Sequence, residues 1–220
     1  MRRICWDFRV SALVGYAQSN LQSGFTATGT PFFPLTGTGI PLTSFTFNTD
    51  DLYGISIQTL NATGSTVENI TWDDWTYDDP CWVDSDGNPT SMIVSPGDGL
   101  WIQGSTGDSI TTAGLVGTSD VDVVWASDGF RLIANPYPIS VSVADLVFTT
   151  VSGDLYGISI QTLNSTGGTV ENITWDDWSY DDPCWVDSDG NPATTMIAPG
   201  SAVWIQASIG DTLRIPAPEL

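Results

Sequence analysis

The sequence contains no lysine and no histidine, and its five basic residues are all arginine. The missing histidine excludes Ser-His-Asp and Cys-His catalytic sites, a histidine general base and the usual histidine-bearing zinc sites. The missing lysine excludes a P-loop and a lysine nucleophile. The composition leaves one familiar catalytic device, which is a pair of carboxylates of the kind that glycoside hydrolases use.

Positive charge is scarce in the whole chain. Twenty-six acidic residues oppose the five arginines, which gives a formal net charge of −21. Binding to phosphate groups needs a basic face, so this charge argues against a nucleic acid partner and against an anionic membrane surface. Charge of one sign also makes compact states and assemblies repel themselves, so salt or divalent cations should strengthen both. Part of the acidity has a simpler origin, because aspartate is common in turns.

The chain lacks the long apolar run of a membrane span and the charge pattern of long helices. It is rich in Ser, Thr, Gly, Val and Ile, and Pro and Gly interrupt it at short intervals. This pattern predicts an all-β fold of the antiparallel sandwich or small-barrel type. We expect strands over 52–60, 67–72, 99–103 and 109–116, a short hairpin joining 81–83 to 92–94, and a helical turn at 41–45 and at 143–148.

Residues 51–89 return almost unchanged as residues 154–192. The two stretches differ only at Ala62/Ser165, Ser65/Gly168 and Thr76/Ser179. The repeat predicts two tandem domains related by internal duplication, over 1–117 and 118–220. An enzyme gains little from two copies of one site, whereas a fibre, a coat or a multivalent binder gains contact surface, so the repeat argues against catalysis.

A loop rich in tryptophan and aspartate is the best candidate for a binding site in each repeat. Aromatic rings that stack on sugar faces, beside carboxylates that accept hydroxyl hydrogen bonds, make a carbohydrate platform. The alternative is that these aromatic residues belong to the core or cover a sheet edge. The candidate platform residues are Trp72, Trp75, Tyr77, Trp82, Trp175, Trp178, Tyr180 and Trp185.

The end of the same loop resembles a calcium-binding turn. Its oxygen ligands would be Asp84, Asp86 and Asn88, and in the second repeat Asp187, Asp189 and Asn191. The turn glycine is present, but the later bidentate Glu of an EF-hand is absent. The alternative is an ordinary hairpin turn. The adjacent pairs Asp73/Asp74 and Asp78/Asp79 are the candidates for carboxylate catalysis, although such pairs are usually solvated turn residues.

Two further motifs recur in both repeats. Asn61, Asn69, Asn164 and Asn172 lie in glycosylation sequons, and the strand pattern places Asn69 and Asn172 on an outward face. The three cysteines are Cys5, Cys81 and Cys184, of which the last two are equivalent positions. We expect either buried free thiols or a bridge between repeats or subunits, with one thiol left over.

The N-terminal segment alternates apolar and polar residues. Ile4, Trp6, Phe8 and Val10 alternate with Cys5, Asp7 and Arg9, so the segment could complete the sheet edge of a neighbouring copy. It could equally pair within its own domain. The chain starts Met1-Arg2-Arg3 like a signal peptide, but charges interrupt the following run, so no convincing signal peptide is present.

Several short motifs carry a resemblance to known proteins. Gly129 to Pro138 reads G-F-x-x-x-x-N-P-Y-P, and Pro199 to Gln206 reads P-G-x-x-x-W-I-Q. With the Leu-Tyr-Gly strand and the Trp/Asp-rich middle, these motifs resemble uncharacterised secreted bacterial proteins built from repeats of about one hundred residues. The resemblance implies an extracellular or cell-surface β-sandwich with a surface or matrix role, and it carries no catalytic residues across.

The sequence therefore predicts a non-enzymatic, secreted structural protein that assembles into an extracellular fibre or surface layer. The joint would be a head-to-tail contact between similar units or the addition of the N-terminal strand. The alternative is a tandem carbohydrate-binding module that uses the Trp/Asp-rich loop. A carboxylate enzyme is the third reading. Calcium is the one candidate cofactor.

Overall fold

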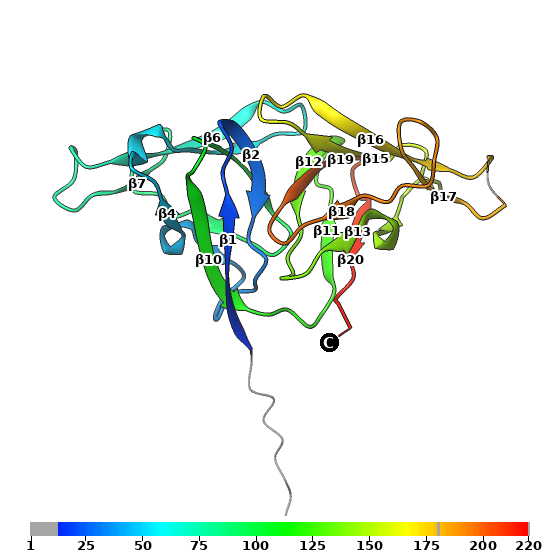
Figure 1. Ribbon diagram of the computed structural model, residues 1–220, viewed down its shortest axis with the longest axis horizontal. Coiled ribbons are helices and arrows are strands. Elements are labelled where there is room, and N and C mark those ends of the chain that lie inside the picture. Colours follow the sequence, from blue (N-terminus) through cyan, green and yellow to red (C-terminus); the bar gives the residue numbers. More distant parts are fainter. Residues whose placement is uncertain (1–12, 180, 220) are drawn as a thin grey trace, which may run out of the picture.

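The protein is all-β, as the sequence predicts, and its sheets are antiparallel (Figure 1). The computed structural model describes residues 13–179 and 181–219. Within this part of the chain the only helical segments are three single 3-10 turns, at Leu42–Ser44, Leu52–Gly54 and Val143–Asp145. The first and third confirm the predicted helical turns. None of these segments has the length and apolar character needed to cross a membrane.

The first ten strands form two main sheets that pack face to face. One sheet has the order β1-β10-β4 and the other β2-β9-β5-β6-β7, while β3 pairs with β8. The buried cluster between them includes Phe32, Leu42, Ile57, Ile70 and Ile102. The strands are β1 Val14–Asn20, β2 Gly24–Gly29, β3 Ile40–Pro41, β4 Thr46–Asn48, β5 Ser56–Leu60, β6 Thr66–Asp73, β7 Cys81–Val83, β8 Ile93–Val94, β9 Gly99–Gly104 and β10 Ser109–Leu115.

The last ten strands repeat this arrangement in the same order. The sheets are β11-β20-β14, β12-β19-β15-β16-β17 and β13-β18, so each sheet takes its strands from one side of residue 117. The division into two separate domains stays a prediction, because the two halves share buried contacts. The strands are β11 Val121–Val124, β12 Gly129–Ala134, β13 Val141–Ser142, β14 Val147–Thr149, β15 Ser159–Leu163, β16 Thr169–Asp176, β17 Cys184–Val186, β18 Met196–Ile197, β19 Ala202–Ala207 and β20 Thr212–Ile215.

Two strand predictions need correction. The predicted strand over 52–60 begins only at Ser56, because Asp51 accepts a hydrogen bond from the Tyr53 backbone N–H at 3.0 Å and turns residues 52–54 into a 3-10 turn. The predicted hairpin turn forms, but it brings residues 88–90, and not 92–94, back onto the 82–84 segment. The Asp84 N–H donates to the Asn88 carbonyl and the Thr90 N–H donates to the Trp82 carbonyl, both at 2.8 Å. Strand β7 pairs with β6, and β8 pairs with β3, so the loop between β7 and β8 passes from one sheet to another.

The two halves contact each other through a reciprocal set of hydrogen bonds. The Phe25 N–H donates to the Ser165 carbonyl at 2.8 Å, and the equivalent Phe130 N–H donates to the Ala62 carbonyl at 2.9 Å. A second pair joins Gly29 to Gly200 at 2.7 Å and Ala134 to Gly97 at 2.9 Å. Each half therefore offers the same face to the other. A small apolar cluster of Trp101, Leu132, Ala134 and Ala202 lies at this contact.

The reciprocal contact changes how the repeat must be interpreted. A contact in which both partners use the same patch is isologous and closes on itself, whereas a fibre needs two different complementary patches. The sequence interpretation took the joint between the repeats as a head-to-tail contact that other copies could repeat. The observed joint is of the closed kind, so it does not supply that contact.

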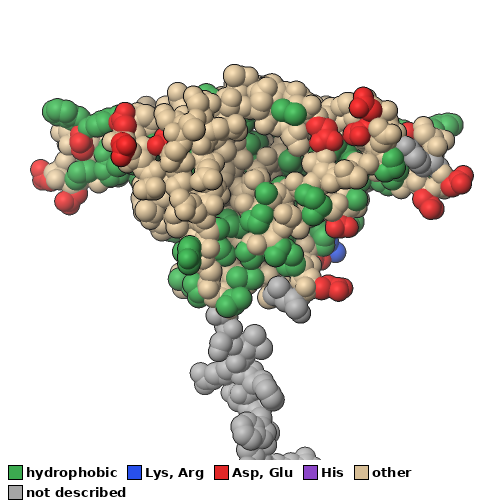
Figure 2. All heavy atoms as spheres, viewed as in Figure 1, with side chains coloured by type: hydrophobic (Ala, Val, Ile, Leu, Met, Phe, Trp, Pro, Cys, Tyr) green, Lys and Arg blue, Asp and Glu red, His purple; other side chains and the backbone are tan. Residues whose placement is uncertain are grey.

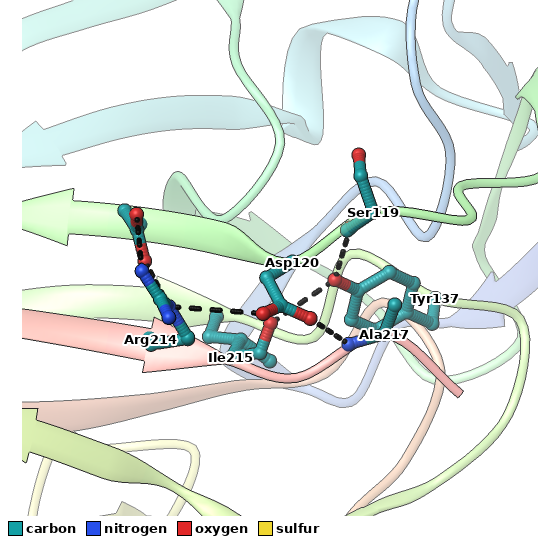
Figure 3. Close-up of polar contacts among 7 residues, drawn as sticks. Ser119, Asp120, Tyr137, Arg214, Ile215 and Ala217 are labelled. Atoms are coloured by element: carbon teal, nitrogen blue, oxygen red, sulfur yellow. Dashed lines mark hydrogen bonds and ion pairs between the residues drawn. The ribbon is translucent and has the colours of Figure 1, made fainter. Parts of the chain in front are cut away.

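A buried tyrosine anchors the junction between the halves to the C-terminal strand (Figure 3). The Tyr137 side chain is fully buried, and its hydroxyl lies 2.8 Å from the Ser119 carbonyl and 3.1 Å from the Ile215 carbonyl. Beside it, Asp120 accepts from the Ala217 N–H at 2.9 Å. Burial, with a smaller contribution from the Asp120 charge, raises the pKa of Tyr137 to about 12.

Candidate functional site

The Trp/Asp-rich loops lie at opposite ends of the molecule. One follows β6 and the other follows β16, and they project along the longest axis (Figure 1). The space-filling view shows acidic side chains gathered at both ends (Figure 2). The protein therefore presents the same loop twice, facing away from the centre in two directions.

An aspartate at the start of each loop fixes its shape. The Asp73 carboxylate accepts from the backbone N–H groups of Trp75 at 2.8 Å and Thr76 at 2.9 Å. Hydrogen bonds from Thr76, through its side chain and its backbone, and from the Trp75 N–H lower the pKa of Asp73. The group stays ionised and is suited to holding the turn. It is poorly suited to donating a proton to a leaving group, which a glycosidase acid must do.

The central tryptophan of each loop is almost fully exposed. Trp75 and Trp178 each keep 86% of their surface accessible. A ring of this size normally contributes to a core or an interface, because it removes a large apolar area from water when it is buried. The hydrogen-bonded turn presents this ring to solvent, which makes it the candidate binding surface of the loop.

A tyrosine and a second aspartate complete the site. The Tyr53 hydroxyl donates to the Asp74 carboxylate, and this hydrogen bond, with a smaller desolvation effect, raises the pKa of Tyr53. In the second half Tyr156 makes the same bond to Asp177, and the Trp178 indole N–H donates to the Tyr156 hydroxyl. About half of each tyrosine surface is exposed. Each site is thus a Trp-Tyr-Asp platform.

The sequence interpretation missed the tyrosine and overlooked the role of the second aspartate. Tyr53 lies 21 residues before Asp74, and the alternation of residues 52–60 suggested that its side chain shared a face with Ile55 and Ile57. Asp51 was the available signal, because an aspartate side chain often begins a turn by accepting from the backbone N–H two residues on. The turn moves Tyr53 out of the strand and toward the loop.

Four of the predicted platform residues lie in the core or pack against it, and of these Trp72 and Trp175 are only partly buried. Trp82 and Trp185 are only 6% and 4% exposed, and Trp72 and Trp175 pack edge to face against them at 5.3 Å. Their alternation along β6 and β7 points them inward, so Trp82 and Trp185 cannot present a ring face to a sugar. Tyr77 stays beside the loop and donates to the Gly87 carbonyl at 2.7 Å. Tyr180 lies outside the described residues.

A hollow lies at the base of the first loop. It has a volume of about 380 Å³ and is lined by the 43–47 segment, Leu52, Trp72, Pro80 and the 81–82 pair. Leu52 precedes Tyr53, and Trp72 precedes the aspartate that holds the loop. The hollow therefore lies beside the residues that come just before Tyr53 and Asp73 in the chain.

In the predicted calcium turn, the first aspartate already accepts hydrogen bonds from the backbone of the same turn. The Asp84 carboxylate accepts from the N–H groups of Asp86 at 3.0 Å and Asn88 at 2.9 Å, and Asp187 does the same in the second half. These bonds are those of an ordinary aspartate turn. No group of three or more acidic, Cys or His side chains among residues 13–179 and 181–219 could hold a metal ion. Calcium binding here stays a prediction.

The sequons occupy two different environments. Asn61 and Asn164 are exposed, and each caps a turn by accepting from the backbone N–H two residues on at 2.9 Å. Asn69 and Asn172 are half-buried on their strands and accept from the hydroxyls of Ser56 and Ser159. Glycosylation at all four stays a prediction.

Cys81 and Cys184 are half-buried free thiols, so among the described residues no disulfide joins the two repeats. They lie on β7 and β17, toward opposite ends of the molecule (Figure 1). Cys5 and the N-terminal assembly residues Ile4, Trp6, Phe8 and Val10 lie outside the described residues.

Comparison of the chain with family models, with curated proteins and with solved structures gave no match. The resemblance to secreted bacterial repeat proteins therefore stays a prediction. The motifs that carry it have a structural role of their own. Phe130 donates to Ala62 and Gly200 accepts from Gly29, so both residues take part in the contact between the halves. Trp204 packs edge to face on Phe130.

Proposed function

We propose that this protein is a non-enzymatic, extracellular carbohydrate-binding protein with one sugar site at each end. The observation that supports it is the pair of Trp-Tyr-Asp platforms, in which Trp75 and Trp178 are exposed on hydrogen-bonded loops at opposite ends of the molecule. The indole faces would stack on sugar rings, and the carboxylates of Asp74 and Asp177 would accept hydrogen bonds from hydroxyl groups.

The charge around the platforms narrows the ligand class. Each loop carries several aspartates, and the two arginines among the described residues are paired away from the loops, Arg131 with Asp98 and Arg214 with Asp122. An acidic glycan would meet uncompensated like charge. We therefore propose a neutral or amino-bearing polysaccharide. Two sites facing in opposite directions would bridge two polysaccharide molecules, and this gives the internal repeat a function.

The duplicated site provides its own control experiment. Binding of soluble neutral polysaccharides should survive Trp75→Ala or Trp178→Ala alone, because one platform remains. Bridging, measured as turbidity or as polysaccharide sedimented with the protein, should be lost in either single variant. Binding should be lost in the double variant.

The size of the effect follows from the area of the indole. A sugar that covers one face of a tryptophan buries on the order of 100 Å², which contributes about 2.5 kcal/mol at about 25 cal/mol per Å². Loss of one platform should weaken binding at that end by about 10- to 100-fold. Unchanged binding in the double variant would refute the proposal. Repeating the titration with calcium and with a chelator tests the calcium turn at the same time.

A self-assembling subunit of an extracellular fibre or surface layer is the second candidate. The edge of strand β1, which other described strands leave uncovered, supports an association between two copies, and a fibre or layer would need a second contact in addition. Negative-stain electron microscopy of purified protein, with calcium and with chelator and without glycan, separates the two candidates. Regular filaments or sheets would support assembly, whereas dispersed particles under every condition would remove it.

A further inference from the structure

Strand β1 is the longest sheet edge that other described strands leave uncovered. It has seven residues and pairs only with β10, on one side. The edge strands β2 and β12 of the larger sheets are covered by the opposite half through the reciprocal bonds. The edges β4, β7, β14 and β17 have three residues each, and β11 has four. Natural proteins normally shorten, cover or charge such edges.

No other described residue pairs with the outward backbone groups of β1. The Leu13 carbonyl accepts from the Val116 N–H at 2.8 Å. The backbone N–H and carbonyl groups of the odd-numbered residues of β1 therefore point toward β10, and those of the even-numbered residues point away from it. Among the described residues no hydrogen bond reaches the backbone N–H or carbonyl of Val14, Tyr16 or Gln18. The Val14 and Tyr16 side chains are 58% and 80% exposed. Within the described part of the chain, the edge therefore offers both unpaired backbone groups and apolar surface.

The same region carries no charge in a protein of net charge −21. Residues 13–49 and 109–119 contain no Asp, Glu, Lys or Arg, so β1, its neighbour β10 and strand β4 are entirely uncharged. Figure 2 shows acidic side chains at both ends and over part of the second half, and none over β1 and β10. Two copies can approach through this region without placing carboxylates against each other, which is not true of the ends.

The second half shows what a protected edge looks like in this fold. In β1, Gln18 pairs with Thr111, and at the equivalent place in β11, Asp122 pairs with Arg214. Gln18 is therefore equivalent to Asp122, and Tyr16, two residues earlier, is equivalent to Asp120. Asp122 is paired with Arg214 at 2.8 Å, and Asp120 lies beside them (Figure 3). The second half therefore carries charged side chains at this sheet edge, and the first half carries uncharged side chains at the equivalent positions.

We propose that β1 is the contact between two copies of this protein, which pair antiparallel through their β1 edges across a two-fold axis. If Tyr16 faces Gln18 and Val14 faces Asn20 of the other copy, the outward backbone groups of all four residues are satisfied in both copies. The two three-stranded sheets become one sheet of six strands. This contact closes on itself, so it yields a pair and not a fibre. It uses none of the platform residues.

The first test is the mass of the full chain in solution, measured by light scattering over a wide range of protein concentration. We expect a dimer of twice 23.5 kDa that is strengthened by salt. Tyr16→Asp places in β1 the residue that the second half carries, and it should weaken the dimer at least tenfold. The matched control is Val124→Asp, which adds the same charge at an exposed position of β11. It should leave the dimer intact.

Hydrogen exchange of the unmodified protein gives a second test that needs no variant. The amides of Tyr16 and Gln18 should exchange slowly in the dimer, as slowly as those of Gly15 and Ala17, which face β10. A monomer at every concentration, or a dimer that Tyr16→Asp does not affect, would overturn the proposal. Slow exchange of the Tyr16 amide in a monomer would also overturn it, because the chain would then cover its own edge.

Discussion

Replacement of Gly129 by alanine tests whether the reciprocal contact holds the two halves together. Gly129 has a φ of +117°, which disfavours residues with a side chain. A Cβ at this position would lie 2.6 Å from the Ala62 carbonyl oxygen and 2.9 Å from the Ala62 Cβ. The same carbonyl accepts the Phe130 N–H from the opposite half. The added methyl group must therefore push the Ala62 turn away and weaken that hydrogen bond.

The expected loss has two parts. The unfavourable backbone conformation costs about 1–3 kcal/mol. The weakened hydrogen bond adds about 0.5–1.5 kcal/mol. Gly87→Ala is the matched control, because Gly87 has a φ of +79° and no atom within 4 Å of the added Cβ. The control should lose about 1–2 kcal/mol from backbone strain alone.

Urea unfolding followed by tryptophan fluorescence measures both variants. Gly129→Ala should lower the free energy of unfolding by about 1–2 kcal/mol more than Gly87→Ala does, since only the first disturbs the contact. Equal losses in the two variants would refute the reasoning, because the reciprocal contact would then contribute nothing to stability. Two separate transitions in the unmodified protein would support the predicted division into two domains.

Three further predictions concern single side chains and charge. Trp82→Ala should lower the free energy of unfolding by about 3–5 kcal/mol in thermal or urea unfolding, because it empties the core, whereas Trp75→Ala should change it by less than about 0.5 kcal/mol. Tyr137→Phe should cost about 1–3 kcal/mol, because the Ser119 and Ile215 carbonyls lose their donor. The pKa of Tyr137 rises on folding from its ordinary 10.0 to about 12. The stability that the protonated Tyr137 hydroxyl contributes is therefore complete below pH 10 and is lost as the pH rises toward 12. When the free energy of unfolding is measured against pH in this range, it should fall more steeply for the wild type than for Tyr137→Phe. The melting temperature should rise with salt, because the net charge of −21 repels itself, and a melting temperature that falls with moderate salt would contradict this.

Local signals in the sequence were sufficient for the fold class. Frequent turn residues and alternation, as in residues 67–72, predict antiparallel strands because side chains of a strand point to alternate faces. The asparagine turn at residue 61 and both helical turns follow from similarly local rules. The partner predicted for residues 81–83 was wrong, because Ile93–Val94 pair with β3 and neighbours in sequence are only the most frequent strand partners.

The candidate site was predictable only in part. The repeated loop drew attention to Trp75 and Trp178, but the sequence could not separate them from Trp82 and Trp185, which lie in the core. Burial depends on which neighbours pack over a residue, and that depends on the pairing of β6 with β7. The pairing of Tyr53 with Asp74 was invisible for the same reason, because a turn at Asp51 brings together residues from two elements.

The sequence by itself determined that the chain repeats, that it folds as antiparallel sheets, and that histidine and lysine chemistry is absent. These properties depend on composition and on neighbours along the chain. The tertiary structure decided how the two copies meet, which tryptophans face water and which sheet edge is left bare. Each of these depends on contacts between residues far apart in sequence, such as Phe25 with Ser165. A local sequence pattern does not indicate which distant residues a given residue will contact.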